Sequence, residues 1–466
     1  MPAPIAIAQG IGGKAAGRDA AGWRLLYRGT AGALVVGAGG AGLGLLVNVI
    51  LARLLGVPAY GAYTLALTWV SILSMAALLG QSSSVVRLVP RYVQQEAWAE
   101  LRGLRRRMSA LVVSASVVVS LTGAIFVQLF RGRLGSELDL TLLAGFVLLP
   151  VFAQLQLSGA LHRGLKRAAS SCAFNSLLRP AVLAGLVLVF ALLLHQRLSA
   201  PLAMLASCLG ALVALGGSEW LLARAWPSRA ARVEPRYETR AWVGLGLQLF
   251  LFSAIGMLLN SVDVLVLGGL GGASQVGPYY AALRLGGVAA YGLNAVNVIL
   301  APMIAERYAA SDHAGLARLV HRAAWLTFGV TFVAALAAAL LGRRLLGLFG
   351  PGFEAAYVPL LVILAAQCVN AATGPVGYVM TMTRFERQAP LIFGGGALLN
   401  VALSFLLVPG LGMLGAAIAA ACATACWKIT AFFFVRRKLG INPTVLPLPT
   451  QDPTHETAQF LHPRSA

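Results

Sequence analysis

The stretch NVILARLLGVPAYGAYTLALTWVSILSMAALLGQSSSVVRLVPRY occupies residues 48–92 and carries the clearest indication of the fold class. Residues 43–95 contain no Asp or Glu, and apolar runs lie on both sides of Gly56 and Pro58. A helix needs about 20 apolar residues to cross the roughly 30 Å hydrocarbon core of a bilayer. The stretch therefore predicts the end of one transmembrane helix and the whole of the next.

The composition extends this interpretation to the whole chain. Of its 466 residues, 59% are hydrophobic and 11% are charged, whereas a soluble protein is roughly 25% charged. These values exclude a soluble multidomain enzyme, a disordered chain and a disulfide-stapled secreted scaffold. Twelve apolar segments have the length of a span, near residues 30–54, 60–82, 108–130, 139–161, 172–194, 201–224, 242–270, 277–301, 320–342, 355–381, 388–408 and 413–435. We predict an all-α polytopic membrane protein with about twelve transmembrane helices.

The excess of basic residues predicts the orientation of the chain. It carries 36 Lys and Arg against 15 Asp and Glu, for a net charge of +21. In a soluble protein this excess would suggest nucleic acid, but in a membrane protein Lys and Arg concentrate in cytoplasmic loops. With the N-terminus inside, 26 of the basic residues fall in cytoplasmic segments and six in external loops. We predict that both termini are cytoplasmic and that no nucleic acid is bound.

A polar link near the middle of the chain divides the predicted spans into two sets of six. Each half places an Asn near the end of its first span, Asn48 and Asn260, and a Gly-x-Tyr element near the start of its second, at Gly61 and Gly277. We predict two pseudo-symmetric lobes around a central cavity, related by an axis along the membrane normal. The predicted parts are an N-tail (1–29), an N-lobe (30–224), a linker (225–241), a C-lobe (242–438) and a disordered C-tail (439–466).

Motifs that could carry enzyme chemistry have simpler interpretations. Residues 37–42 match the GxGxxG pattern of dinucleotide-binding folds, but no strand precedes them and no acidic residue follows at the required spacing. Close helix packing around Gly40 and Gly44 is favoured instead. Cys422 and Cys426 are four residues apart but have no His or acidic partner nearby. We predict no metal site and no catalytic residues.

Charged residues inside the predicted spans are the candidates for function. Each costs about 2.5–3.5 kcal/mol near the bilayer centre on insertion scales, and such groups usually face the protein interior. Asp263 is the only carboxylate deep in a span, and Glu219 lies near the inner end of another. For Asp263, a structural ion pair with Arg284 or another buried base is the alternative to a functional charge. The basic residues in or next to spans are Arg53, Arg87, Arg179, Arg284 and Lys428. Snorkelling to lipid head groups is the alternative for Arg53, Arg87 and Lys428.

The opening run resembles that of a known family. Residues 52–56 read Ala-Arg-Leu-Leu-Gly, residues 60–63 read Tyr-Gly-Ala-Tyr with Ala59 in the place of the usual acid, and Leu79, Gly80 and Arg87 complete the pattern. These elements resemble the bacterial polysaccharide-biosynthesis membrane proteins, the oligosaccharide or O-antigen flippases. Residues 260–285 and 301–309 are similar to the seventh and eighth spans of that family, and the resemblance covers residues 25–440.

The resemblance implies membership of the multidrug/oligosaccharidyl-lipid/polysaccharide (MOP) exporter superfamily, whose two six-helix lobes work by alternating access. It implies a transporter and not an enzyme. The substrate would be an undecaprenyl-diphosphate-linked oligosaccharide, such as an O-antigen (lipopolysaccharide) or exopolysaccharide repeat unit. It would move from the inner to the outer leaflet of the bacterial inner membrane. Polymerase and chain-length regulator proteins are candidate partners, and we expect a monomer.

On this interpretation the diphosphate is held by inward-facing bases, for which Arg groups are well suited because they bind phosphate oxygens in a fork. The candidates are Arg53, Arg87, Arg179 and Arg284. Asp263 and Glu219 are the candidates for ion coupling or for a gate. No cofactor is expected, and coupling to H⁺ or Na⁺ is left open.

Two alternatives remain. A multidrug (MATE) antiporter of organic cations would need acidic cavity residues, and the sequence offers only Asp263 and Glu219. A membrane-embedded glycan polymerase or ligase would need a large external loop, and no predicted external loop exceeds about a dozen residues. The lipid II flippases of the superfamily usually have fourteen spans and an acidic-Ala-Phe element after the first, and this chain lacks both.

Overall fold

The computed structural model describes residues 12–132, 135–194, 198–383, 385 and 387–446, and every regular element in this part of the chain is a helix. The first half forms α1 (Gly12–Leu78), α2 (Gln81–Gln94), α3 (Trp98–Leu129), α4 (Ser136–Gly164), α5 (Ala168–Cys172), η1 (Ala173–Leu178), α6 (Arg179–Leu194), α7 (Ala200–Ala225) and α8 (Ser228–Arg232). The second half forms α9 (Thr239–Gly271), α10 (Ala273–Ala309), α11 (His313–Gly347), η2 (Phe353–Ala356), α12 (Tyr357–Ala372), α13 (Val376–Met382) and α14 (Ala389–Leu439).

Two of the helices bend where the sequence separates predicted spans. Helix α1 leaves helical geometry at Gly56 (φ 75°, ψ 174°), and Pro58 follows within the same helix. Helix α14 does so at Gly412 (φ 55°, ψ −131°). Glycine reaches these positive φ values without the cost that a Cβ imposes. Each bend therefore divides one continuous helix into two segments, at the boundary between two predicted spans.

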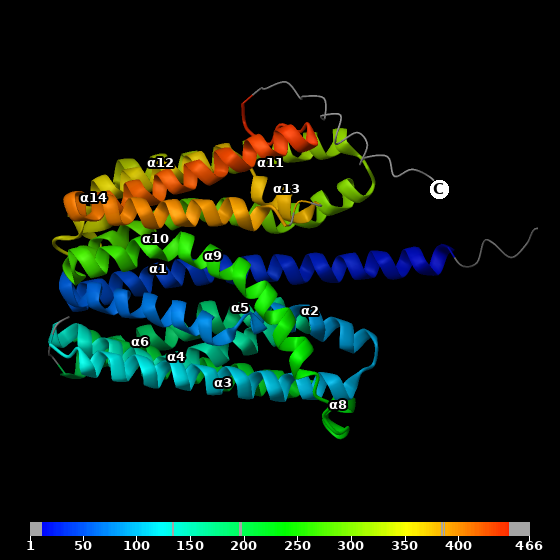
Figure 1. Ribbon diagram of the computed structural model, residues 1–466, viewed down its shortest axis with the longest axis horizontal. Coiled ribbons are helices and arrows are strands. Elements are labelled where there is room, and N and C mark those ends of the chain that lie inside the picture. Colours follow the sequence, from blue (N-terminus) through cyan, green and yellow to red (C-terminus); the bar gives the residue numbers. More distant parts are fainter. Residues whose placement is uncertain (1–11, 133–134, 195–197, 384, 386, 447–466) are drawn as a thin grey trace, which may run out of the picture.

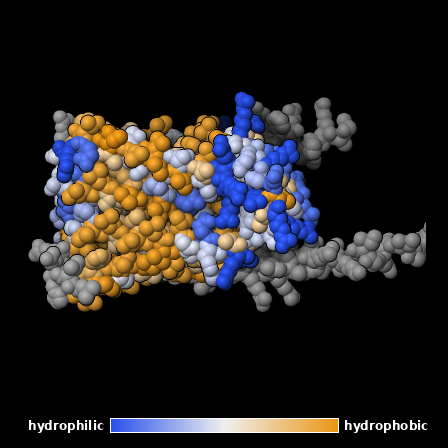
Figure 2. All heavy atoms as spheres, turned by 90° about the horizontal axis from the view of Figure 1, so that it is seen from below, coloured by the Kyte–Doolittle hydropathy of each residue, from blue (hydrophilic) through white to orange (hydrophobic). Residues whose placement is uncertain are grey.

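The outer surface has the character of a lipid-facing belt. Among the described residues, nine helices are long and apolar enough to cross a membrane, and α1 and α14 are two of them. Large apolar side chains are strongly exposed on these helices, such as Leu129 (76%), Leu340 (77%) and Leu391 (75%). Figure 2 shows a broad hydrophobic band with hydrophilic residues gathered mainly toward one end. Such exposure suits hydrocarbon as the solvent. The number of twelve spans stays a prediction.

The helices form two groups that meet along α1, α9 and α10. Helices α3 to α7 pack with α1 on one side, and α11 to α14 pack with α9 and α10 on the other (Figure 1). The start of α1 and the end of α14 lie at the same end of the bundle, which we call the terminal end. The opposite end, where α1 bends and α10 begins, is called the distal end.

The two groups touch most closely at the distal end, at the two glycines of the predicted repeat. A Cβ on Gly61 would lie 1.8 Å from the carbonyl oxygen of Ala273 and 3.1 Å from the backbone nitrogen of Gly277. A Cβ on Gly277 would lie 2.6 Å from the carbonyl oxygen of Val57. The backbones of α1 and α10 therefore cross in contact there, and only glycine permits that approach.

The link between the two groups is held against α3 and α2. Arg102 donates to the carbonyl of Val233 at 2.6 Å, and Arg236 forms an ion pair with Glu100 at 3.3 Å. Trp242 donates from Nε1 to the hydroxyl of Tyr92 at 2.8 Å. Burial raises the pKa of the Tyr92 hydroxyl above its ordinary value. These contacts give the polar residues between α7 and α9 a defined path across the terminal end.

The two chain ends depart from the sequence interpretation in one respect each. Helix α1 already begins at Gly12, inside the predicted N-tail. The sequence predicts a disordered C-tail from residue 439, but residues 439–444 are buried in the structure. His321 on α11 bonds to the carbonyl of Thr444 at 2.8 Å, and Val445 donates to the carbonyl of Ala372 at 3.1 Å. The prediction is wrong there because partners on α11 and α12 supply contacts that composition does not reveal. Residues 447–466 lie outside the described residues.

Candidate functional site: a basic cavity between the helix groups

One wall of the candidate site is built by a widened helical turn before α6. The π-helix η1 leads directly into Arg179, and Pro180 follows it. Proline cannot donate a backbone hydrogen bond, and its ring crowds the carbonyl four residues earlier, so a wider turn relieves the strain at this point. Such turns are frequent at functional sites. Asn175, Ser176 and Arg179 from this segment all line a cavity of ≈ 510 Å³.

The glycine-rich part of α1 forms the neighbouring wall. A Cβ on Gly40 would lie 2.5 Å from the Cβ of Ser176, so α1 packs directly on η1 at this point. Gly37 and Gly44 have nothing within 4 Å of such a Cβ, and both line the cavity. The structure therefore places Gly40 in close helix packing, as the sequence interpretation favoured. The neighbouring glycines instead leave open space in the cavity wall.

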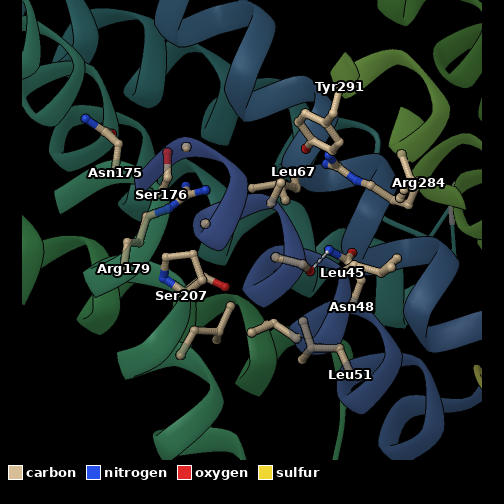
Figure 3. Close-up of a pocket in the computed structure, with 18 of the residues that line it drawn as sticks. Leu45, Asn48, Leu51, Leu67, Asn175, Ser176, Arg179, Ser207, Arg284 and Tyr291 are labelled. Atoms are coloured by element: carbon tan, nitrogen blue, oxygen red, sulfur yellow. Dashed lines mark hydrogen bonds between the residues drawn. The ribbon is translucent and has the colours of Figure 1, made fainter. Parts of the chain in front are cut away.

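The opposite wall comes from α10. Arg284 donates through Nη2 to the hydroxyl of Tyr280, and its Cζ lies 4.6 Å from the centroid of that ring. The Arg284 side chain is solvent-accessible although α10 lies inside the bundle, because the guanidinium faces the cavity. Figure 3 shows Arg284 beside Tyr291, across the pocket from Arg179, Asn175 and Ser176. The two arginines thus approach one space from the two helix groups.

A second cavity of ≈ 510 Å³ adjoins the first and shares Leu67, Arg179, Arg284 and Tyr291 with it. We call the two together the central cavity. Its further polar lining comes from Thr68, Ser71, Asn260, Ser261 and Gln367. None of the described residues that line the central cavity is Asp or Glu. A space with two arginines, many neutral polar groups and no carboxylate attracts an anion.

Comparison with known proteins assigns the chain to a family. The sequence profile of the polysaccharide biosynthesis protein family matches residues 26–307, which is more than half of the chain. The chain belongs to this polysaccharide biosynthesis protein family. No curated protein matches it by sequence. The family membership confirms the resemblance in the opening run.

The fold of this polysaccharide biosynthesis protein is shared with solved transporters of the MOP superfamily. An inward-facing multidrug resistance MATE family transporter aligns with a TM-score of 0.65 at 16% identity, covering 88% of this chain and 93% of that one. The lipid II flippase MurJ in an inward closed conformation aligns with a TM-score of 0.66 at 14% identity, covering 86% of each. The chain is thus a polysaccharide biosynthesis family protein with the multi-pass helical membrane fold that these solved transporters share.

A third similar structure shows that pocket charge varies within this fold. It is a MOP superfamily transporter from Pyrococcus furiosus, described as having a binding pocket of reverse polarity that suggests a different function. It aligns with a TM-score of 0.62 at 14% identity, covering 89% of this chain and 96% of that one. Because identity is this low, the likeness shows the fold alone. The charge of the central cavity must be taken from this chain's own residues.

The structure brings together two of the four arginines predicted to hold the diphosphate. Arg179 and Arg284 share the central cavity. Arg87 lines a different cavity at the terminal end. Arg53 is exposed near the bend of α1, lines none of the three cavities, and donates from Nε to the carbonyl of Leu348 at 2.5 Å. A single four-arginine site is therefore not formed, because the bend of α1 turns Arg53 toward the end of α11.

Asp263 lies in α9 and is only 3% exposed. The hydroxyl of Tyr279 on α10 donates to its Oδ2 at 2.5 Å, while its Oδ1 is buried without a hydrogen-bond partner among the described residues. The ion pair with Arg284, which was the alternative to a functional charge, is not among the ion pairs of the described chain. The next residue along α9, Val264, lines the central cavity, whereas Asp263 itself does not.

Glu219 has a partner that ties α7 to α3. Its Oε2 lies 3.0 Å from Nη2 of Arg105, and the two side chains are 33% and 27% exposed. Arg105 also lies over the Trp226 ring, at 4.9 Å from the centroid. Glu219 lines none of the three cavities described here. This geometry favours a packing role over the predicted role in coupling or gating.

Several lining residues were not anticipated from the sequence. Tyr291 and Ser207 have no charge and no unusual spacing, so no sequence signal distinguishes them from core residues. Asn175 and Ser176 could have been found, because two polar residues precede the Arg179-Pro180 pair inside an apolar segment. Lys428, for which snorkelling was the alternative, is only 6% exposed and lines the cavity at the terminal end.

Proposed function

We propose that this transporter flips an undecaprenyl-diphosphate-linked oligosaccharide from the inner to the outer leaflet of the bacterial inner membrane. The observation that carries the proposal is the pairing of Arg179 and Arg284 across the central cavity. One arginine comes from each helix group, so an anion bound by both would link the two groups. Rearrangement of the groups around that anion would then expose it alternately to each side.

The physical cost of flipping explains why a cavity is needed. Each hydroxyl of an oligosaccharide is costly to bury in hydrocarbon without hydrogen-bond partners. Amides and hydroxyls such as Asn48, Asn175 and Ser176 offer such partners along the central cavity. The prenyl chain needs no partner and can stay in the lipid. The protein thus has to shelter only the polar head of the substrate.

The membrane potential supplies a driving force in this proposal. We place both chain termini in the cytoplasm, so that the terminal end faces inward, as the distribution of basic residues predicts. A diphosphate of charge about −2 that moves outward through an inside-negative potential releases about 4–5 kcal/mol per 100 mV. Export is therefore favoured unless a co-transported cation cancels the charge.

Asp263 is the candidate for a coupled cation. It is a buried carboxylate that accepts a hydrogen bond from Tyr279 on α10, and its other oxygen has no hydrogen-bond partner among the residues that the structure describes. If a proton or Na⁺ binds there during the cycle, Asp263→Asn should remove the dependence of transport on the ion gradient. Flipping by Asp263→Asn should be measured with and without a pH or Na⁺ gradient. If the Asp263→Asn variant flips at the wild-type rate and its rate still responds to the gradient, the coupling role is excluded.

The flippase proposal is tested directly in proteoliposomes that contain the purified protein and a fluorescent undecaprenyl-diphosphate oligosaccharide. We expect the sugar to become accessible to an external lectin at a rate that depends on the protein. An organic cation dye in parallel vesicles tests the MATE alternative, which the absence of acidic residues among the described lining of the central cavity disfavours. Dye transport with a static sugar would overturn the proposal and support a cation antiporter.

A further inference from the structure

A third cavity, of ≈ 910 Å³, opens between α2 and the second helix group at the terminal end. We call it the terminal cavity. Its volume lies in the range of sites for small organic ligands, roughly 300–1,000 Å³. Its walls come from α2, α9, α10, α12, α13 and α14. It shares no residue with the central cavity, and neither the diphosphate nor the coupling proposal uses it.

Three basic side chains line the terminal cavity. They are Arg87 on α2, Arg387 just before α14, and Lys428 inside α14. No described residue that lines it is Asp or Glu, and none of the three bases takes part in an ion pair of the described chain. Lys428 is buried; its Nζ donates over a long 3.4 Å to the carbonyl of Gly374 and lies 4.7 Å from the centroid of the Trp427 ring. A buried amino group with such weak partners would gain from an anion beside it, because an anion stabilises the charged ammonium form that burial disfavours.

Other groups in the terminal cavity suit a sugar. Nε1 of Trp427 and Oδ1 of Asn297 are buried without hydrogen-bond partners among the described residues, and both residues line the cavity. They offer one unused donor and one unused acceptor. The Trp427 and Phe393 rings pack edge to face, 4.8 Å apart, and form an apolar wall beside these polar atoms. A sugar ring likewise combines hydroxyl groups with apolar C–H faces.

The terminal cavity continues the central cavity along the same helices. On α9, Ser253 lines the terminal cavity and Met257 the central one. On α12, Asn370 lines the terminal cavity and Gln367 lines the central one. These pairs are four and three residues apart, so about 4.5–6 Å of helix separates the two linings. A ligand with its diphosphate at Arg179 and Arg284 could thus extend its glycan into the terminal cavity.

We propose that the terminal cavity binds the glycan part of the substrate and that this glycan carries a carboxylate, as in a uronic acid, which pairs with Lys428. This inference rests on the proposed flippase function and specifies its substrate class. Arg87 and Arg387 add to the positive field at the cavity, and Trp427 and Asn297 bond to hydroxyl groups. A neutral glycan would leave Lys428 with no anionic partner.

The test compares two lipid-linked probes in proteoliposomes of phosphatidylethanolamine. One is an undecaprenyl-diphosphate trisaccharide that ends in glucuronic acid, and the other is its glucose-terminated counterpart. We expect wild-type protein to flip the acidic probe about tenfold faster, because a charge-assisted bond is lost with the neutral one. Lys428→Met should lower the rate for the acidic probe to that of the neutral probe and so remove this preference. Met fills a similar volume without introducing an unpaired polar group.

Further variants keep the result interpretable if Lys428→Met is poorly folded. Arg387→Gln, at an exposed side chain, should reduce the preference in part, and Arg318→Gln, an exposed arginine on α11 outside the three cavities, should not change it. Equal wild-type rates for both probes would overturn the inference but leave the flippase function intact. Movement of neither probe would instead contradict the proposed function. Lys428→Met could instead slow the neutral probe, and do so only in vesicles that contain phosphatidylglycerol. That result would show that Lys428 binds a lipid head group, and it would overturn the inference.

Discussion

Replacing Arg179 or Arg284 by glutamine is expected to slow flipping of a lipid-linked oligosaccharide by about tenfold to a hundredfold. Hydrogen bonds to a charged group contribute about 1.5–3 kcal/mol each, and 1.4 kcal/mol corresponds to a factor of ten. Both side chains reach the central cavity, where no described lining residue is acidic. The double variant should be slower than either single one. The rate at which sugar becomes accessible outside proteoliposomes measures the effect.

Two further variants separate charge from geometry in this experiment. Lysine at either position keeps the charge but cannot form the two parallel bonds of a guanidinium, so Arg284→Lys should recover only part of the rate. Arg106→Gln removes an exposed arginine of α3 that lines none of the three cavities. It should transport like wild type. A double Arg179→Gln, Arg284→Gln protein that flips at the wild-type rate would refute the diphosphate role.

Gly61→Ala is expected to open the contact between the helix groups and to abolish most transport. Its Cβ would lie 1.8 Å from the carbonyl oxygen of Ala273, and that oxygen belongs to the backbone and cannot rotate away. The helix groups must therefore separate at the distal end. Overpacking of this kind costs about 1–3 kcal/mol. The thermal unfolding temperature of the purified protein should fall by several degrees, and flipping measured in proteoliposomes should fall with it.

Gly269→Ala provides the matched control for this substitution. Gly269 lies near the end of α9, is exposed, and would have no atom within 4 Å of an added Cβ. Alanine is favoured over glycine in a helix by about 0.5–1 kcal/mol, so this variant should be as stable as wild type or slightly more so. If Gly61→Ala behaves like Gly269→Ala in both measurements, the close crossing of α1 and α10 has no role in the cycle.

Much of the fold could be predicted from the sequence because hydropathy in a membrane protein is a local property. Long runs without charge must be helices in lipid, since every backbone group has to be bonded within its own segment. The gap between the first two predicted spans, residues 55–59, contains the bend of α1 at Gly56, where glycine reaches the positive φ at no steric cost. The opening run also carried the family resemblance, which the match over residues 26–307 confirms.

The tail and the charged residues show where local reasoning stops. Richness in proline predicts disorder after residue 439, yet Thr444 is bonded to His321 on a distant helix. Arg53, like Arg179 and Arg284, lies in or next to a predicted span, and the sequence therefore makes all three candidates for one site. Only Arg179 and Arg284 share a cavity in the structure. Helix direction and bends decide which of the three face the same space, and those depend on neighbouring helices.

Hydropathy and short motifs along the chain are enough to identify a helical membrane protein of the polysaccharide biosynthesis family, because both are local properties of the sequence. Only the tertiary structure decided that Arg179 and Arg284 face one cavity, that Asp263 pairs with Tyr279, and that Lys428 is buried in a second basic space. Each of these facts joins residues from different helices. Their distances are set by the packing of α1, α9, α10 and α14 against one another, and no local pattern encodes that packing.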